Sequence, residues 1–201
     1  MAQPRGRPRG LTLEQISDAV LEDGIATFSM PSIARRLGVA HSGLYRYIRD
    51  REELLVLSLD RIASEATWPS PDLPWRDELR GIGETLWTIC GQYPGYANAA
   101  VASKHASPGF IAAVTPHIAS LHRQGLDQVA ATAAVEFVAT LVITSSLSAD
   151  RLTVIKDETD VPERTLPGFD DPELWTGRAW YARHLGVYLE GLAGSFTPTD
   201  D

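Results

Sequence analysis

The sequence contains a single cysteine, Cys90, among its 201 residues. One cysteine excludes a disulfide framework and a zinc site built from several thiolates, and it suits a reducing compartment. No apolar run approaches the roughly 18 residues that favour a membrane span. The arginines near the N-terminus are followed by no apolar stretch, which argues against a signal peptide. We therefore expect a cytoplasmic protein that makes no use of a membrane.

Motifs typical of metal sites and enzymes are also missing. The five histidines form no HxxxH or HxxE pair, and His117 and His122, five residues apart, fall on different faces of a helix. No G-x-S-x-G segment places a serine nucleophile. Cys90 lies on an apolar helical stripe, where burial leaves a thiol inert. We expect no metal, no cofactor and no enzymatic activity.

No segment shows the clear two-residue alternation of a β-strand, whereas apolar residues recur at helical spacing, so the sequence predicts an all-α fold. The formal net charge of −8 argues by itself against a nucleic-acid partner. The distribution of charge argues the opposite. Residues 1–51 carry eight arginines and five acids, whereas residues 61–201 carry ten basic and eighteen acidic residues. A basic head on an acidic body indicates that the head meets a polyanion.

Residues 29–51 have the pattern of a helix-turn-helix. Ser29 can cap a helix whose apolar side chains run to Gly38, where a short turn is expected. A second short helix then carries Leu44 and Ile48 inward. Its outward residues are donors and aromatics with no acid among them, namely His41, Ser42, Gly43, Tyr45, Arg46 and Tyr47. A helix needs such a surface to enter the major groove of DNA.

Further helices are predicted on both sides of this motif. Thr12 and Gln15 form a capping box for a helix that ends at Gly24, and Asp50 with Glu53 begins a helix that runs to about Thr67. Three prolines in residues 68–74 mark a break. Beyond an apolar stripe from Leu79 to Cys90, we expect helices over 95–104, 108–123, 126–148 and 173–195, with a mobile loop over 150–174. The predicted domains are a flexible basic arm (1–10), a DNA-binding domain (11–52) and a body (53–201).

The segment 126–148 is apolar on all sides, with Glu136 as the one charge between Asp127 and Asp150. Such a helix must be covered on every face. Its length and its serines and threonines favour a protein interface over a membrane. The last helix offers Gly186, Gly191 and Gly194 for close approach, so we predict a homodimer through these two segments.

The motifs IARRLGV at 33–39, GLYRY at 43–47 and REELL at 51–55 resemble the TetR family of bacterial transcriptional repressors. The resemblance is strong over 11–62 and weaker over 75–195. It implies an all-α fold with a DNA-binding head and a body that dimerises and binds a small-molecule effector, the head contacting a double-stranded operator. The residues SMPSI at 29–33 depart from the family's Thr-Thr-x-x-Ile. Because Met30 and Pro31 cannot hydrogen-bond a base, operator preference is expected to differ from that of the tetracycline regulators.

The predicted DNA contacts are Arg5, Arg7, Arg9, Ser29, His41, Ser42, Gly43, Tyr45, Arg46, Tyr47 and Arg51. Tyr45 is assigned to a phosphate because Leu44 and Ile48 fill the inward face, although a short helix can also bury a tyrosine. Arg46 is either a guanine-contacting residue or a phosphate clamp. The Arg-Gly-Arg-Pro arm either enters an A·T-rich minor groove or is a solubilising tail.

The resemblance also implies an effector pocket, for which the candidates by position are Ile82, Leu86, Ser103, Phe110, Val114 and His117. The alternative for these residues is an ordinary core. Ile82 and Ala100 stand about where the tetracycline regulators have asparagine and a magnesium-binding histidine, so a tetracycline–magnesium effector is not expected. The resulting hypothesis is a ligand-responsive repressor that binds a palindromic operator as a homodimer. The alternative is a small-molecule sensor that has lost operator binding.

Overall fold

The computed structural model describes residues 10–155 and 177–196, and within them all regular structure is helical, which confirms the all-α prediction. The first four helices are α1 (Leu13–Asp23), α2 (Met30–Arg36), α3 (His41–Leu44) and α4 (Arg51–Glu65). The remaining helices are α5 (Trp75–Gln92), α6 (Tyr96–Ala102), α7 (Pro108–Arg123), α8 (Gln128–Ile155) and α9 (Gly177–Leu192), with a 3-10 turn over Ala193–Ser195. Arg5, Arg7 and Arg9 lie outside the described residues.

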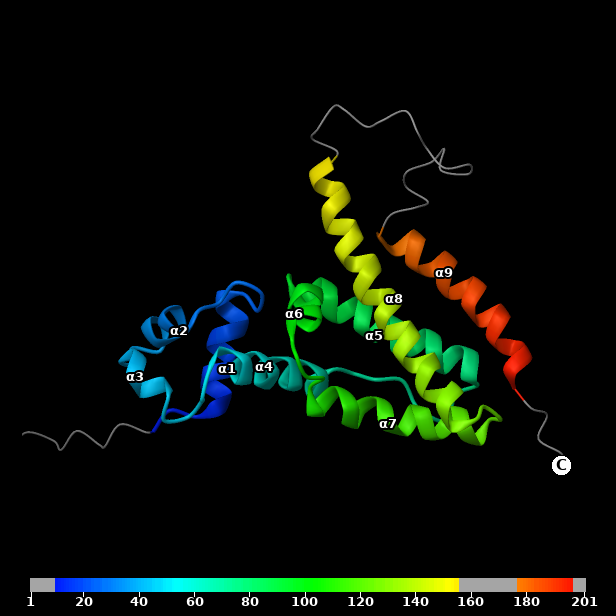
Figure 1. Cartoon of the computed structure of the whole chain (residues 1–201), viewed down its shortest axis with the longest axis horizontal. Helices are drawn as coiled ribbons and strands as arrows, with labels where there is room; N and C mark the ends of the chain where they lie inside the picture. The colour runs from blue at the N-terminus through cyan, green and yellow to red at the C-terminus, as the bar shows by residue number, and fades with distance from the viewer. Residues whose placement is uncertain (1–9, 156–176, 197–201) are drawn as a thin grey trace, which may run out of the picture.

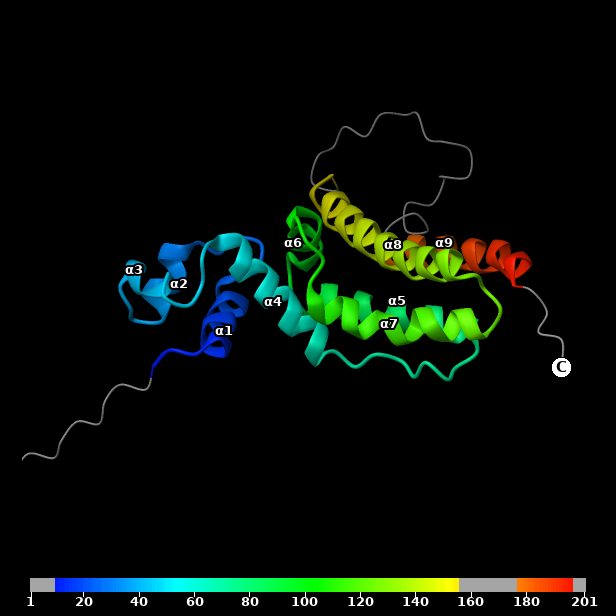
Figure 2. The same ribbon diagram turned by 60° about the horizontal axis from the view of Figure 1, so that its bottom comes forward.

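The helices form a small head and a larger body joined by α4. Figure 1 shows α1, α2 and α3 at one end of the molecule, with α4 running from them toward the body. In Figure 2, α5 and α7 make one layer of the body and α8 and α9 the other. Because α4 packs on α1 of the head and on α6 and α7 of the body, it links head and body.

The predicted helix starts are found where side chains cap the backbone. Thr12 and Gln15 exchange hydrogen bonds of 3.0 and 3.2 Å at the start of α1, which confirms the capping box. Asp50 accepts from the Glu53 backbone N–H at 2.8 Å, whereas the Glu53 carboxylate accepts from the backbone N–H of Arg49 instead of Asp50. The cap of α4 is therefore confirmed, but it is one-sided.

Several predicted boundaries differ from the structure. The second helix of the motif closes after Leu44, and single turns carry the chain to Ile48, whose N–H still bonds to the Leu44 carbonyl. α4 ends at Glu65, two residues before the predicted Thr67. The loop predicted over 150–174 is wrong at its start, because α8 continues to Ile155. The part over 156–176 lies outside the described residues.

The apolar segment predicted at 126–148 has one covered and one open face within a single chain. Ala131, Ala134 and Val138 are completely buried, and α8 packs on α5, α7 and α9. On the open face, Val129 is 78% exposed and Phe137 is 41% exposed. The window Gln128–Leu147 has the length and composition of a membrane span, with 39% of it buried inside the protein. These contacts therefore leave more than half of this window uncovered.

Candidate DNA-contacting surface and effector cavity

The outward face of the helix-turn-helix is arranged as the sequence predicts. Leu44 has no exposed surface and Ile48 is 3% exposed, so both belong to the core of the head. Tyr45 is 49% and Tyr47 is 39% exposed, and His41, Ser42 and Arg46 are exposed beside them, while Gly43 is half-buried. The Tyr45 ring meets His41 edge-on at 5.2 Å. The exposed tyrosines exclude the buried-aromatic alternative, and the DNA contacts themselves remain predictions.

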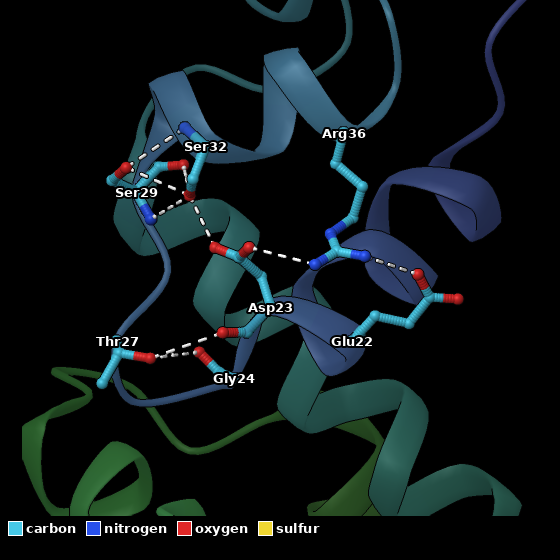
Figure 3. Close-up of polar contacts among 7 residues, drawn as sticks. All are labelled: Glu22, Asp23, Gly24, Thr27, Ser29, Ser32 and Arg36. Atoms are coloured by element: carbon cyan, nitrogen blue, oxygen red, sulfur yellow. Dashed lines mark hydrogen bonds and ion pairs between the residues drawn. The ribbon is translucent and has the colours of Figure 1, made fainter.

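The start of α2 is anchored to the end of α1 by Asp23, as Figure 3 shows. The Ser32 hydroxyl donates to Oδ2 of Asp23 at 2.6 Å, and the Ser29 and Ser32 side chains each accept from the other residue's backbone N–H. Arg36 bridges Asp23 at 3.4 Å and Glu22 at 3.0 Å. The hydrogen bond from Ser32 lowers the pKa of Asp23 against the opposing effect of burial, and Arg36 lowers it further. The predicted DNA residue Ser29 is thus held in a fixed orientation at the surface.

Arg51 makes its described contacts inside the head. Its guanidinium donates to the carbonyl oxygens of Phe28 at 3.1 Å and Ala26 at 3.4 Å, and it lies 4.4 Å above the Phe28 ring. These bonds attach the start of α4 to the loop between α1 and α2. Only the part of the Arg51 guanidinium that these contacts leave exposed is available to DNA.

A cavity of about 540 Å³ lies in the body, enclosed by parts of five helices and by the loop between α6 and α7. Its lining is Leu59 from α4, Leu86 from α5, Tyr96, Ala100 and Val101 from α6, residues 103–107 from the loop, Phe110, Val114 and Ile118 from α7, and Thr132, Val135, Glu136, Ala139, Thr140, Ile143 and Thr144 from α8. A volume of this size suits a drug-sized ligand. Burial raises the pKa of Tyr96 to about 12, so its hydroxyl stays protonated near neutral pH.

Four of the six predicted pocket residues line this cavity, namely Leu86, Ser103, Phe110 and Val114. The structure places the other two, Ile82 and His117, outside the lining. Ile82 has no exposed surface and belongs to the core. His117 is 2% exposed and lies with its Nδ1 2.7 Å from the buried carboxylate of Glu78. Both side chains therefore pack inside the body and do not line the cavity.

Metal binding has no structural support in the described ranges, 10–155 and 177–196. No three or more histidine, cysteine, aspartate or glutamate side chains gather there in an arrangement that could hold an ion.

Comparisons with known proteins agree with this architecture. The family model for bacterial regulatory proteins of the tetR family matches residues 13–57. An HTH-type transcriptional regulator of Saccharopolyspora erythraea is 29% identical over 161 residues, which cover 78% of this chain and 67% of that protein. The head therefore matches the tetR family of bacterial regulatory proteins, and most of the chain is similar to a transcriptional regulator.

Other proteins similar to this chain include a transcriptional repressor and proteins that share its fold. The transcriptional repressor DrrR1 of Streptomyces coeruleorubidus is 30% identical over 96 residues, 45% of this chain but 36% of that protein. The crystal structure of ActR from Streptomyces coelicolor in complex with actinorhodin superposes with a TM-score of 0.77 at 20% identity and covers 94% of this chain and 99% of ActR. BioQ of Mycobacterium smegmatis gives 0.67 at 20% identity, over 91% and 96% of the chains. The structural likenesses establish the fold.

Two features of the structure are not among the predictions made from the sequence. Arg35, in the last turn of α2, is exposed and makes no ion pair within the described residues, which adds a cation to the head surface. In α8, the positions 132, 136, 140 and 144 carry Thr, Glu, Thr and Thr, and all four line the cavity. Residues four apart lie on one helical face, so this polar stripe in an apolar helix was the available signal.

Proposed function

We propose that this chain is a cytoplasmic, ligand-responsive repressor of the TetR family that binds a palindromic operator as a homodimer and is released by a small-molecule effector. The observation that carries the proposal is that one helix, α4, connects the head surface with the cavity of the body. The head carries an exposed face without acids just before α4, and Leu59 of α4 lines an apolar cavity in the body. A ligand that fills the cavity can therefore act on the head through one helix.

The homodimer is supported by apolar surface that a single chain leaves open. Val187 of α9 is 73% exposed, beside the exposed Val129 and Phe137 of α8. A Cβ built on Gly186, Gly191 or Gly194 meets nothing within 4 Å, so the fold of one chain does not require glycine at these positions. Close approach of a second copy supplies a reason for them. Two heads related by a two-fold axis match the two half-sites of an inverted repeat.

The proposed effector is a largely apolar molecule with a few hydrogen-bonding groups. The cavity walls are mainly aliphatic and aromatic, and hydroxyls of serine and threonine are spread among them. The charged groups of the lining are Glu136, on α8, and Lys104 and His105, on the loop. Neither carboxylate nor ammonium makes an ion pair with a described residue, so both remain available to a ligand.

The test is selection of DNA from a random duplex pool by the purified full chain, followed by footprinting of the recovered operator. We expect an inverted repeat whose half-sites are about one helical turn, or a multiple of it, apart. A thermal-shift screen of apolar and of highly charged small molecules then identifies effectors, which should weaken operator binding. Failure to select any sequence, combined with tight binding of a small molecule, would support the sensor without operator function. A screen that returned only highly charged ligands would contradict the proposed effector class.

A further inference from the structure

The loop between α6 and α7 is at once a wall of the cavity and a partner of α4. Residues 103–107 line the cavity. At one end of this wall, the backbone N–H of Lys104 donates to Oε1 of Glu52 at 2.9 Å, and the Ser103 hydroxyl lies 3.4 Å from the same oxygen. Beyond the other end, the backbone N–H of Gly109 donates to Oδ1 of Asp60. The segment 103–109 is therefore fastened to α4 by two carboxylates.

The contact between this segment and α4 is close as well as polar. A Cβ on Gly109 would lie 2.5 Å from the backbone oxygen of Asp60, so only glycine fits at this position. Ser107 caps α7 by accepting from the N–H of Phe110 at 3.1 Å, and Phe110 faces the cavity. Movement of the cavity wall and movement of the first turn of α7 are therefore linked.

Glu52 is adjacent in the chain to the residue that holds the helix-turn-helix. Arg51 donates to the carbonyls of Ala26 and Phe28, and Phe28 immediately precedes Ser29, the N-cap of α2. Glu52 thus bonds to the cavity wall while Arg51 bonds to the base of α2. The half-buried position of Glu52 and its bond to a backbone N–H make this a charge-assisted hydrogen bond of the stronger kind.

We propose that Glu52 is the coupling residue that transmits cavity occupancy to the DNA-binding head, through its hydrogen bonds to residues 103 and 104. This inference rests on the proposed function, because it assumes that the cavity takes the effector. A ligand shifts an equilibrium only by binding one conformation better than the other. A group that fills the cavity displaces the 103–107 wall, and Glu52 carries that displacement to α4 and Arg51. Without the Glu52 carboxylate, residues 103 and 104 are no longer bonded to the start of α4, and less of the displacement reaches Arg51.

The experiment fills the cavity without knowledge of the natural effector. Cys90 is replaced by serine and Ala139, a small residue of the cavity wall, by cysteine, in the full-length chain. Labelling with N-(1-pyrenyl)maleimide places an apolar aromatic group in the cavity. Affinity for the selected operator is measured by fluorescence anisotropy of the DNA, before and after labelling. Labelling is expected to weaken operator binding at least about tenfold, within the usual range of allosteric coupling.

Variants of Glu52 in this background separate coupling from folding. In Glu52→Ala, we expect unlabelled protein to bind the operator as before, and labelling to change the affinity less than about threefold against the tenfold range of coupling. Glu52→Gln retains an oxygen acceptor and should retain most of the effect of the label. Glu65→Ala, on α4 but paired with Arg61 and away from the loop, should behave as the parent.

Each outcome decides one of two questions. If the unlabelled parent binds no operator, the proposed function fails. If the labelled Glu52→Ala protein loses operator affinity as fully as the labelled parent, the coupling role of Glu52 is wrong while the repressor function stands. If labelling leaves the parent's affinity unchanged, cavity occupancy does not act on the head and the coupling proposal is overturned. Should Glu52→Ala fail to fold, hydrogen exchange on the parent decides: the Lys104 amide should lose protection on labelling, and unchanged protection contradicts the proposal.

Discussion

Oε1 of Glu78 on α5 lies 2.7 Å from Nδ1 of His117 on α7, and Glu78 has no exposed surface. The other carboxylate oxygen accepts from Ser120 at 2.9 Å and from Gln124 at 3.2 Å. Gln124 in turn accepts from the backbone N–H of Trp75, the first residue of α5, at 2.7 Å. This buried cluster therefore holds the proline-rich segment 68–74 and the start of α5 against α7.

Replacement of Glu78 by alanine should lower the free energy of unfolding by about 3–5 kcal/mol, because it removes the buried carboxylate that His117, Ser120 and Gln124 contact. Denaturant titration followed by circular dichroism measures the change. Asp77→Ala is the matched control, since the neighbouring carboxylate is 59% exposed and pairs with Arg80 at 3.3 Å. Its effect should stay within about 0.5 kcal/mol. Equal losses from the two variants would contradict the role given to the cluster.

Replacement of Asp23 by asparagine tests the anchor of α2. The pKa of Asp23 is lowered in the folded state, so the ionised carboxylate contributes stability above its unfolded pKa of about 3.8. That contribution is lost as the pH falls through the lowered folded value. Unfolding titrations should therefore show the variant less stable than the parent at pH 7, with the difference shrinking toward pH 3. Glu22→Gln, whose side chain is 65% exposed, should show little difference at either pH.

Arg46→Ala should weaken operator binding by about 1–3 kcal/mol and relax the preference at one base position, if Arg46 contacts a guanine. Competition binding against single-base operator variants measures both quantities. A uniform loss across all variants would assign Arg46 to a phosphate instead. Arg80→Ala, in the body, serves as the control and should leave binding unchanged.

Deletion of residues 1–10 should weaken operator binding and flatten its dependence on salt. Each phosphate neutralisation that is lost reduces the slope of log K against log salt by about 0.9. Anisotropy titrations over a series of salt concentrations give the slope directly. An unchanged slope in the deleted protein would show that the arm is a solubilising tail.

The sequence predicted best what short-range physics determines. The capping residues Thr12 and Ser29 and the inward Leu44 and Ile48 depend on neighbours a few residues away, and the structure confirms them. The predicted end of α8, at residue 148, is wrong. The polar and charged residues from Asp150 onward favoured a loop, but the sequence has no glycine or proline that would end the helix before Ile155.

The cavity was harder to predict because its walls come together from distant parts of the chain. His117 is a pocket candidate by position alone, and the sequence does not reveal its partner, Glu78, which is 39 residues away along the chain. The stripe of threonines and Glu136 on α8 lies in a segment whose apolar composition favours a protein interface, so the sequence did not indicate that it lines a cavity. Side chains that serve as core and side chains that line a cavity have the same composition, and only packing distinguishes them.

The exposed apolar side chains of α8 and α9 predict how the proposed dimer can be broken. Val187→Glu places a charge among them and should yield a monomer that loses operator binding, whereas the matched Ile111→Glu, on α7 at 52% exposure, should remain dimeric. A charge in a buried interface without a partner is strongly unfavourable. Sedimentation velocity of the two variants measures the association state. A dimeric Val187→Glu protein would place the interface elsewhere.

Light scattering coupled to size-exclusion chromatography, on the unmutated chain with its selected operator, tests the central claim most directly. The account predicts a free protein of twice the 21.9 kDa chain mass at micromolar concentration. It also predicts a complex with an even number of chains on one palindromic duplex. Dissociation of the dimer should be hard to separate from unfolding. A stable monomer of 21.9 kDa that elutes apart from the DNA would contradict the homodimer, the half-site arrangement and the repressor function together.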